Sequence, residues 1–552
     1  MSVRNATVLL LALSTLLFLA ACGSSGSSPA TPVAPPSGNF SNSNLNGTYV
    51  FSIAGTDSNG APYAMVGTFT ANGSGGNNKG GITGGTLDIN DADTTVFTTG
   101  PVTGASINSG STYSVGVDGR GLAVIGTNIP GGFPTLTFDF VLSSSSHGLI
   151  TEFDAFGSGS GTLDLQAAGV TPSGSYAFSF SGATYSGAPF ATVGNFALGS
   201  GGTIQSGLAD FNNGALAISP GETLGGTVVV ASTPSTVLST SQYPSLAFDV
   251  FPISATQLKF IETDENGTLS GDAFSQTGTT VPTGTLAFTM QGILSPSTTP
   301  TQIGAGGFMV TDGAGNITNA STEDFNDGGT LSPATPVPFT ASYAAGGAGR
   351  YTLSNFSSFT PVGLTFAAYP SSGGLLLLEI DTGGVTTGAA YTQTAGATFA
   401  ASQGYGMNLS GINLSGIGSG AVEVDDIAEF TAGGGGTLTN GIIDENYNPA
   451  GSPVLGIELT TGTYGALDSQ GRYGISATAS NSKTSTLLGG FDVIAYTVDG
   501  TTFPFMEYDT GQVATGVIVL QNSSSSSPAL AHPQILKVQQ LVHPHIAQQK
   551  KN

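Results

Sequence analysis

Four residue types recur in one fixed pattern at four places along this chain of 552 residues. The pattern is Glu-x-Asp, then a glycine seven residues after the Asp, then a glutamine five residues further on. Its copies are Glu152, Asp154, Gly161 and Gln166; Glu262, Asp264, Gly271 and Gln276; Glu379, Asp381, Gly388 and Gln393; and Glu507, Asp509, Gly516 and Gln521. Identical spacing in four copies indicates internal repetition, and a chain of this length exceeds what one hydrophobic core holds. We therefore expect four related modules.

Each module opens with a stretch in which apolar residues alternate before a glycine. The stretches are Tyr49, Phe51, Ile53 and Gly55; Tyr176, Phe178, Phe180 and Gly182; Leu286, Phe288, Met290 and Gly292; and Tyr405, Met407, Leu409 and Gly411. A period of two is that of a β-strand with one buried face. Aromatic-rich stretches recur later in each module, and glycine-rich turns separate them. The predicted fold class is all-β.

We expect each module to contain about eight short antiparallel strands in a meander that closes into a barrel, because closure leaves no exposed sheet edge. Such a barrel is similar to the avidin and lipocalin scaffold in strand number and module length only. A two-sheet β-sandwich is the alternative, since short strands at regular spacing suit it as well. The predicted modules span residues 44–168, 169–278, 279–395 and 396–522.

The N-terminus has the features of a lipoprotein signal peptide. A short basic start precedes an apolar run that is too short to span a membrane, and the run ends in Leu19-Ala20-Ala21-Cys22. This ending resembles the lipobox of bacterial lipoproteins, which implies removal of residues 1–21 and acylation of Cys22 by fatty acids such as palmitate. Residues 22–43 are rich in Ser, Gly and Pro and predict a flexible tether. Gly23 stands where an inner-membrane retention signal of the family has Asp, so the resemblance implies the outer membrane of the cell envelope.

Composition argues against several classes of function. The formal net charge of −24 at pH 7 repels phosphate backbones, so we expect no nucleic-acid partner. Cys22 is the only cysteine, and no disulfide can form within the chain. The modules hold one histidine, His147, which we expect in an exposed turn after four serines. One histidine builds neither a Ser-His-Asp triad nor a multi-histidine zinc site, so we predict no catalytic residue, metal or cofactor, and no enzyme.

Three arginines follow a glycine at corresponding places, about 30 residues before the acidic pair of their module. We expect each arginine to clamp that Glu-x-Asp pair in a buried ion cluster, which fixes strand register more than it adds stability. The clusters are Arg120 with Glu152 and Asp154, Arg350 with Glu379 and Asp381, and Arg472 with Glu507 and Asp509. The second module has no arginine, and Lys259 lies on the opposite face of its strand. Glu262 and Asp264 are therefore predicted as a possible ion or ligand site.

A second motif, Asp-x-Asn, occurs once in each module, at Asp88 and Asn90, Asp210 and Asn212, Asp324 and Asn326, and Asp444 and Asn446. Asp and Asn at a strand end favour Asx-turns. A calcium loop is the alternative, although the terminal glutamate and central glycine of an EF-hand are missing. Residues 523–552 form a serine linker and a basic tail, for which we expect disorder, with docking on the acidic body or on anionic envelope polymers as the alternative.

The chain is similar in style to Gly-rich, tandem-β lipoproteins of bacterial envelopes. We expect a structural, adhesive or binding role through the repeated modules, with the lipid anchor as the membrane attachment and an envelope polymer, polysaccharide or protein as ligand. The alternative is a small-molecule carrier with one ligand in each barrel, and the third candidate is a carbohydrate-active enzyme that uses the paired carboxylates. Aromatic side chains that fill each module would favour the first function, and an empty lumen above about 300 Å³ the second.

Overall fold

The computed structural model describes residues 38–522, apart from the segments 77–78, 131–132, 215–217, 232–234, 296–299, 358–362, 415–421, 449–452 and 481–489. All described residues belong to one compact unit. The predicted signal peptide, Cys22, most of the tether and the basic tail lie outside the described residues. No helix among the described residues is long and apolar enough to cross a membrane.

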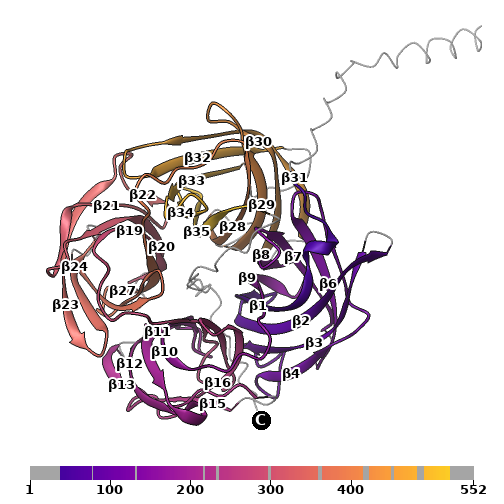
Figure 1. Cartoon of the computed structure of the whole chain (residues 1–552), viewed down its shortest axis with the longest axis horizontal. Helices are drawn as coiled ribbons and strands as arrows, with labels where there is room; N and C mark the ends of the chain where they lie inside the picture. The colour runs from indigo at the N-terminus through magenta and orange to yellow at the C-terminus, as the bar shows by residue number, and fades with distance from the viewer. Residues whose placement is uncertain are drawn as a thin grey trace, which may run out of the picture. The chain divides into compact units, whose positions relative to one another are not determined.

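The described chain folds into four antiparallel sheets that follow one another in sequence (Figure 1). Each contains one copy of the two motifs, and we number the modules 1 to 4 after these sheets. Module 1 comprises a short 3-10 helix η1 (Asn42–Asn44) and β1 (Asn46–Asp57), β2 (Pro62–Gly76), β3 (Lys79–Asp91), β4 (Val102–Ile107), β5 (Thr112–Val115), β6 (Arg120–Ile129), β7 (Phe133–Leu142), β8 (His147–Glu152) and β9 (Gly157–Leu165). Module 2 comprises β10 (Gly174–Ala183), β11 (Pro189–Leu198), η2 (Ser200–Gly202), β12 (Ile204–Asn212), β13 (Ile218–Thr223), β14 (Gly225–Thr227), β15 (Thr236–Ser239), β16 (Leu246–Ser254), β17 (Gln257–Glu262) and β18 (Ser270–Ser275).

Modules 3 and 4 repeat this plan. Module 3 comprises β19 (Gly284–Leu294), β20 (Thr301–Thr311), β21 (Asn316–Asp327), β22 (Thr330–Leu331), β23 (Val337–Gly347), β24 (Arg350–Phe356), β25 (Leu364–Ser371), β26 (Gly374–Glu379) and β27 (Gly384–Thr392). Module 4 comprises β28 (Gln403–Asn413), β29 (Val422–Ala432), β30 (Leu438–Asn448), β31 (Val454–Ala466), β32 (Arg472–Ala479), β33 (Gly490–Tyr496), β34 (Thr502–Glu507) and β35 (Gln512–Leu520).

The sheets roll up into barrels. Module 4 is a closed barrel of eight strands. In modules 1 and 3 the pairings β2–β3 and β20–β21 join each sheet to itself. In module 2 the two edge strands of the sheet are β13 and β14, which are consecutive in the chain. The bridge Thr203↔Thr227 joins β14 to the residue directly before β12 and so connects the two edges of the sheet. The prediction of all-β, barrel-like meander modules is confirmed, and the sandwich alternative is wrong.

Alternating apolar side chains, both aromatic and aliphatic, pack in the core of every module. Ring centroids lie 5.2 Å apart for Phe51 and Phe138 in module 1, and 4.9 Å apart for Phe180 and Phe260 in module 2. Modules 3 and 4 have equivalent contacts between neighbouring aromatic rings. At these separations the rings pack directly against one another, and aliphatic side chains complete the packed cores.

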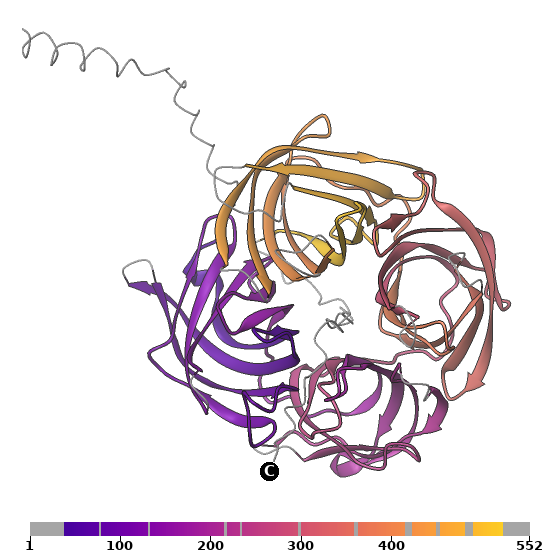
Figure 2. The same cartoon turned by 180° about the vertical axis from the view of Figure 1, so that it is seen from behind.

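The outer barrel faces pack against neighbouring modules, which explains why the first strands are buried on both faces. Val50 and Val66 of module 1 belong to one apolar cluster with Ile261 of module 2. A second cluster joins module 2 to module 3 and module 3 to module 4. A third joins Val141 of module 1 to Ile427 of module 4, where β9 contacts β29. Both views show the first module, in indigo, beside the last module, in orange and yellow (Figures 1 and 2). The contacts therefore form a closed cycle, with four junctions that we name 1–2, 2–3, 3–4 and 4–1.

Candidate functional site at the junctions between modules

The three arginines bind the aspartate of the Asp-x-Asn motif in the preceding module. At junction 2–3, Arg350 donates from Nε to Asp210 Oδ2 at 2.8 Å and from its terminal nitrogen to Oδ1 at 2.7 Å. The Tyr369 hydroxyl donates to the same carboxylate at 2.6 Å. Junction 3–4 repeats this arrangement with Arg472 and Tyr496 on Asp324, and at junction 4–1 Arg120 binds Asp444. The predicted clusters of Arg120, Arg350 and Arg472 with their own Glu-x-Asp pairs are wrong.

The physical reason lies in the two faces of a strand. Leu353 belongs to the core of module 3, so Arg350, three residues earlier on the same strand, points out of the barrel. Glu379 pairs across the sheet with Phe366, another core residue, and therefore points inward. The other arginine-bearing modules have the same alternation. The barrel wall thus separates each arginine from the glutamate that it was expected to bind.

The asparagine of each Asp-x-Asn motif also crosses a junction. Its amide nitrogen donates to two backbone carbonyls at the Glu-x-Asp turn of the next module. The donors and acceptors are Asn90 with Glu262 and Gly267 (2.8 and 2.9 Å), Asn212 with Glu379 and Gly384 (2.9 and 2.8 Å), Asn326 with Asp509 and Gln512 (2.8 and 2.7 Å), and Asn446 with Glu152 and Gly157 (2.7 and 2.9 Å). Asn212 and Asn326 additionally accept local backbone hydrogen bonds of the expected Asx type. Among the described residues, no group of three or more His, Cys, Asp or Glu side chains is arranged to hold a metal ion.

The glutamine that ends each repeat pattern has the same kind of role. Its side-chain nitrogen donates to a backbone carbonyl of the following module, from Gln166 to Pro252 (2.7 Å), Gln276 to Pro370 (2.9 Å), Gln393 to Thr497 (2.9 Å) and Gln521 to Asp118 (2.7 Å). The glycine between them serves the barrel itself: a Cβ atom on Gly161 would overlap the Ser52 carbonyl oxygen of the paired strand. The repeat pattern therefore encodes barrel closure and the joining of modules.

The Glu-x-Asp pair lies at the turn between the last two strands of each module. Asp154 accepts hydrogen bonds from the backbone nitrogens of Thr137 and Phe156, both at 2.7 Å, and so caps the turn. Glu152 is fully buried, and burial, together with the neighbouring Asp154, raises its pKa well above the usual range. Both effects favour the neutral form of Glu152, whose side chain is hydrogen-bonded to that of Asp154.

Module 2 has the same turn. Asp264 accepts from the backbone nitrogens of Ala247 and Asn266 at 2.6 and 2.8 Å. Glu262 accepts from the backbone nitrogen of Leu269 at 2.9 Å, and its pKa is raised well above the usual range, first by burial. The predicted ion or ligand site at Glu262 and Asp264 therefore has turn-capping partners like those of the other modules.

Junction 1–2 has its own buried ion cluster. Lys259 of module 2 lies 3.1 Å from Asp272 and 3.8 Å from Asp164 of module 1. His147 Nδ1 lies 2.7 Å from the other oxygen of Asp164. Burial alone would raise the pKa of Asp164, but the charges of His147 and Lys259 outweigh it and lower the pKa. The expectation of an exposed His147 is wrong, because the β8 strand presents this ring to the junction.

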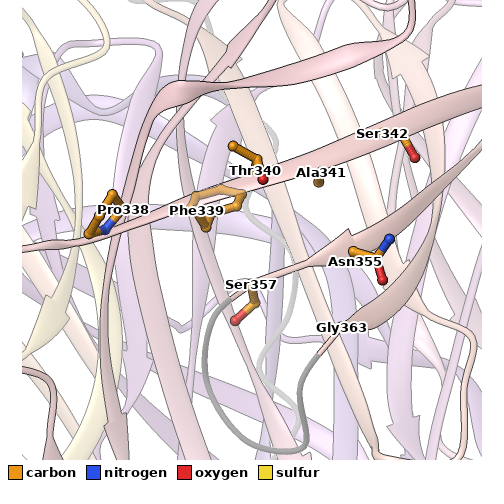
Figure 3. A pocket seen from close by; sticks show the side chains of 8 residues that line it. All are labelled: Pro338, Phe339, Thr340, Ala341, Ser342, Asn355, Ser357 and Gly363. Carbon is orange, nitrogen blue, oxygen red and sulfur yellow. The ribbon is translucent and has the colours of Figure 1, made fainter.

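A hollow of about 550 Å³ lies on the wall of module 3 between β23 and β24 (Figure 3). The two strands pair only from Ser342↔Ser354 toward their turn, so they diverge beside Phe339 and Ser357. The hollow is open to solvent, and its lining includes the side chains of Phe339, Asn355 and Ser357. None of the described residues that line the hollow carries a charge.

The fold defines the chain as an all-β protein built from four joined barrels. No family model matches the sequence, and no curated protein matches it. Among solved structures the chain matches isotype 1 transferrin binding protein B from serogroup B Neisseria meningitidis, with 11% identity, a TM-score of 0.20, and coverage of 68% of this chain and 83% of that one. A likeness at this level carries no argument about ligand or activity.

Proposed function

We propose that this protein is a non-enzymatic lipoprotein of the cell envelope, in which four filled barrels form a rigid platform for binding or adhesion. The observation that carries the proposal is the use of the repeated polar residues. Asn212 and Gln276, with their counterparts in the other modules, connect one barrel to the next, and Asp210, Asp324 and Asp444 do so at three junctions, so the repetition of these residues is explained by the assembly of the barrels. A repeated catalytic or cofactor site is not needed to explain them.

The filled interiors support this function over a carrier. A lipocalin-like carrier needs a lumen for its ligand, whereas aromatic rings pack against each other inside each module. The paired carboxylates also suit catalysis poorly, because Glu152 and its three counterparts are buried in the barrel ends. We propose that ligands, such as an envelope polymer, a polysaccharide or a protein, bind the outer surface, and that the protein needs neither metal nor cofactor.

The anchoring part of the proposal is tested by replacing Cys22 with serine. We expect the wild-type chain to incorporate labelled palmitate and to fractionate with outer membranes, and the Cys22→Ser variant to do neither. Labelling of the variant, or recovery of the wild type in the soluble fraction, would contradict the anchor.

The binding part is tested with the purified full chain against peptidoglycan sacculi, lipopolysaccharide vesicles and whole cells. Saturable retention on one of these surfaces, lost after heat unfolding of the protein, supports a platform. Retention on none of them, together with stoichiometric uptake of an apolar fluorescent probe, would instead favour the carrier.

A further inference from the structure

Lys259 and Asp272 form an ion pair at a position where the other modules have uncharged residues. The two residues lie directly opposite each other on β17 and β18. Leu258 and Phe260, the neighbours of Lys259 along its strand, belong to the barrel core, so Lys259 points outward into junction 1–2. The corresponding cross-strand pairs of the other modules are Leu149↔Thr162, Leu376↔Ala389 and Pro504↔Val517. The fold itself therefore does not require an ion pair at this position.

The ammonium group of Lys259 has few acceptors around it. Lys259 is 1% exposed, whereas Lys79, the other lysine that the structure describes, is exposed. Of its three donor hydrogens, one has an acceptor among the described residues, which is Asp272 Oδ1 at 3.1 Å; Asp164 Oδ2, at 3.8 Å, is beyond hydrogen-bond reach. A buried ammonium group with unused donors is costly. The cost falls when its proton passes to a carboxylate, and the neutral amine that results is a nucleophile.

Asp272 is suited to react with that nucleophile. Burial raises the pKa of Asp272 despite the opposing charge of Lys259, so the carboxylic acid form is favoured. Its Oδ1 accepts a second hydrogen bond from Gln257 Nε2 at 3.2 Å. A donor in this place stabilises the negative charge that develops on the oxygen when an amine attacks the carboxyl carbon.

Asp164 of module 1 provides a base next to the reacting groups. Its Oδ1 lies 2.7 Å from His147 Nδ1, and its Oδ2 accepts from the Thr162 hydroxyl at 2.9 Å, so the orientation of the carboxylate is fixed. Burial would raise the pKa of Asp164, but the charges of His147 and Lys259 lower it, so the carboxylate form is favoured. Its Oδ2 faces Lys259 Nζ at 3.8 Å, where it can accept a proton from the attacking nitrogen.

We propose that Lys259 and Asp272 become joined by an isopeptide bond, a covalent amide cross-link formed within the folded chain. The neutral Nζ of Lys259 attacks the carboxyl carbon of Asp272, and a C–N bond forms. Asp164 accepts a proton from the nitrogen and delivers it to the departing hydroxyl, so the C–O bond breaks and one water molecule leaves. The product carries neither of the two buried charges, and Asp164 keeps His147 as its partner. This inference is independent of the proposed envelope function.

The test is mass analysis of the purified full chain after unfolding and digestion with a glutamate-specific protease. Cleavage after Glu262 and Glu265 separates fragment 223–262, which carries Lys259, from fragment 266–323, which carries Asp272. We expect the wild type to yield one joined species whose mass is the sum of the two fragments less one water molecule, with the link located at these two residues. Separate fragments of unmodified mass would overturn the proposal, as would a link between other residues.

Two variants test the roles of the individual groups. Lys259→Arg keeps the positive charge but has no attacking amine, so its two fragments should separate, and a joined pair would overturn the proposal. Asp164→Asn keeps both reacting groups and removes the base. In cell-free synthesis stopped at intervals with denaturant, its joined form should accumulate about 100-fold more slowly than in the wild type, and an unchanged rate would overturn the role of Asp164. The wild-type digest decides the existence of the cross-link whether or not these variants fold.

Discussion

Removing Arg350 should strongly destabilise the unit formed by modules 2 and 3. The Arg350 side chain is 9% exposed and that of Asp210 is fully buried, so solvent screens the ion pair little. Breaking a buried pair by deleting one partner costs about 3–5 kcal/mol, because the remaining charge stays desolvated. The Tyr369 hydroxyl and the Gly221 nitrogen still donate to Asp210, at 2.6 and 2.8 Å, which places the cost of Arg350→Ala near the lower end, about 3 kcal/mol.

The assay is urea unfolding of the full chain at pH 7, followed by intrinsic tyrosine fluorescence and circular dichroism. Arg350→Lys keeps the charge but loses the two parallel hydrogen bonds, so we expect an intermediate loss of about 1–2 kcal/mol. The double variant Arg350→Ala/Asp210→Asn removes both charges and should recover at least about 1 kcal/mol relative to Arg350→Ala.

Two results would refute the reasoning. A cost below about 1 kcal/mol for Arg350→Ala would place the pair in the range of solvent-exposed ion pairs, contrary to the burial described above. A double variant that loses the sum of the two single losses would show that the two side chains do not interact.

Three other perturbations give clear expectations. Burial raises the pKa of Asp91 to about 8 and that of Glu429 to about 9. Their contribution to stability is therefore full in acid and is lost as the pH rises through these values, so Tm should be higher at pH 5 than at pH 9. A steady rise of Tm from pH 5 to pH 9 would contradict this expectation. Asn446→Ala should lower the free energy of unfolding in urea by about 1–3 kcal/mol, because two carbonyls at the junction lose their donor. The control Asn59→Ala, at an exposed position, should lower it by less than about 0.5 kcal/mol. Equal losses in the two variants would show that the junction hydrogen bonds do not contribute to stability. Glu152→Gln should leave Tm nearly unchanged at pH 5 and raise it at pH 9, since it removes an ionisable group from the core, and a larger loss at pH 9 would argue against a neutral Glu152.

The architecture could be predicted from the sequence because the two features that indicate it, the strand periodicity and the repeat spacing, are local. Strand periodicity and glycine-rich turns depend on neighbouring residues, and the fixed spacing from Glu152 to Gln166 depends on one repeat unit. The partner of Arg350 depends on which barrel faces pack together, and the sequence of a single module does not determine this packing. Part of it was nevertheless present: Arg350 and Leu353 are three residues apart and so lie on opposite strand faces, which already points the arginine away from the core.

Other features left weaker signals. Tyr369 and Tyr496 each follow a core position by three residues and therefore point outward, where a large ring with a polar tip needs a partner. His147 follows four serines, and this composition favoured an exposed turn. Its burial results from packing between modules 1 and 2, which no local pattern records.

The closed cycle of junctions sets this protein apart from linear repeat arrays. In a solenoid, the first and last repeats expose faces that other repeats cover, and special capping repeats must protect them. Here Asn446 of the last module donates to the first, so each barrel acts as the cap of its neighbour. Loss of one barrel would expose the junction faces of both of its neighbours. Insertion of a fifth barrel would require the angle between neighbouring barrels to change at every junction. Selection on such a chain should therefore preserve the number of its repeats more strictly than it does in an open array.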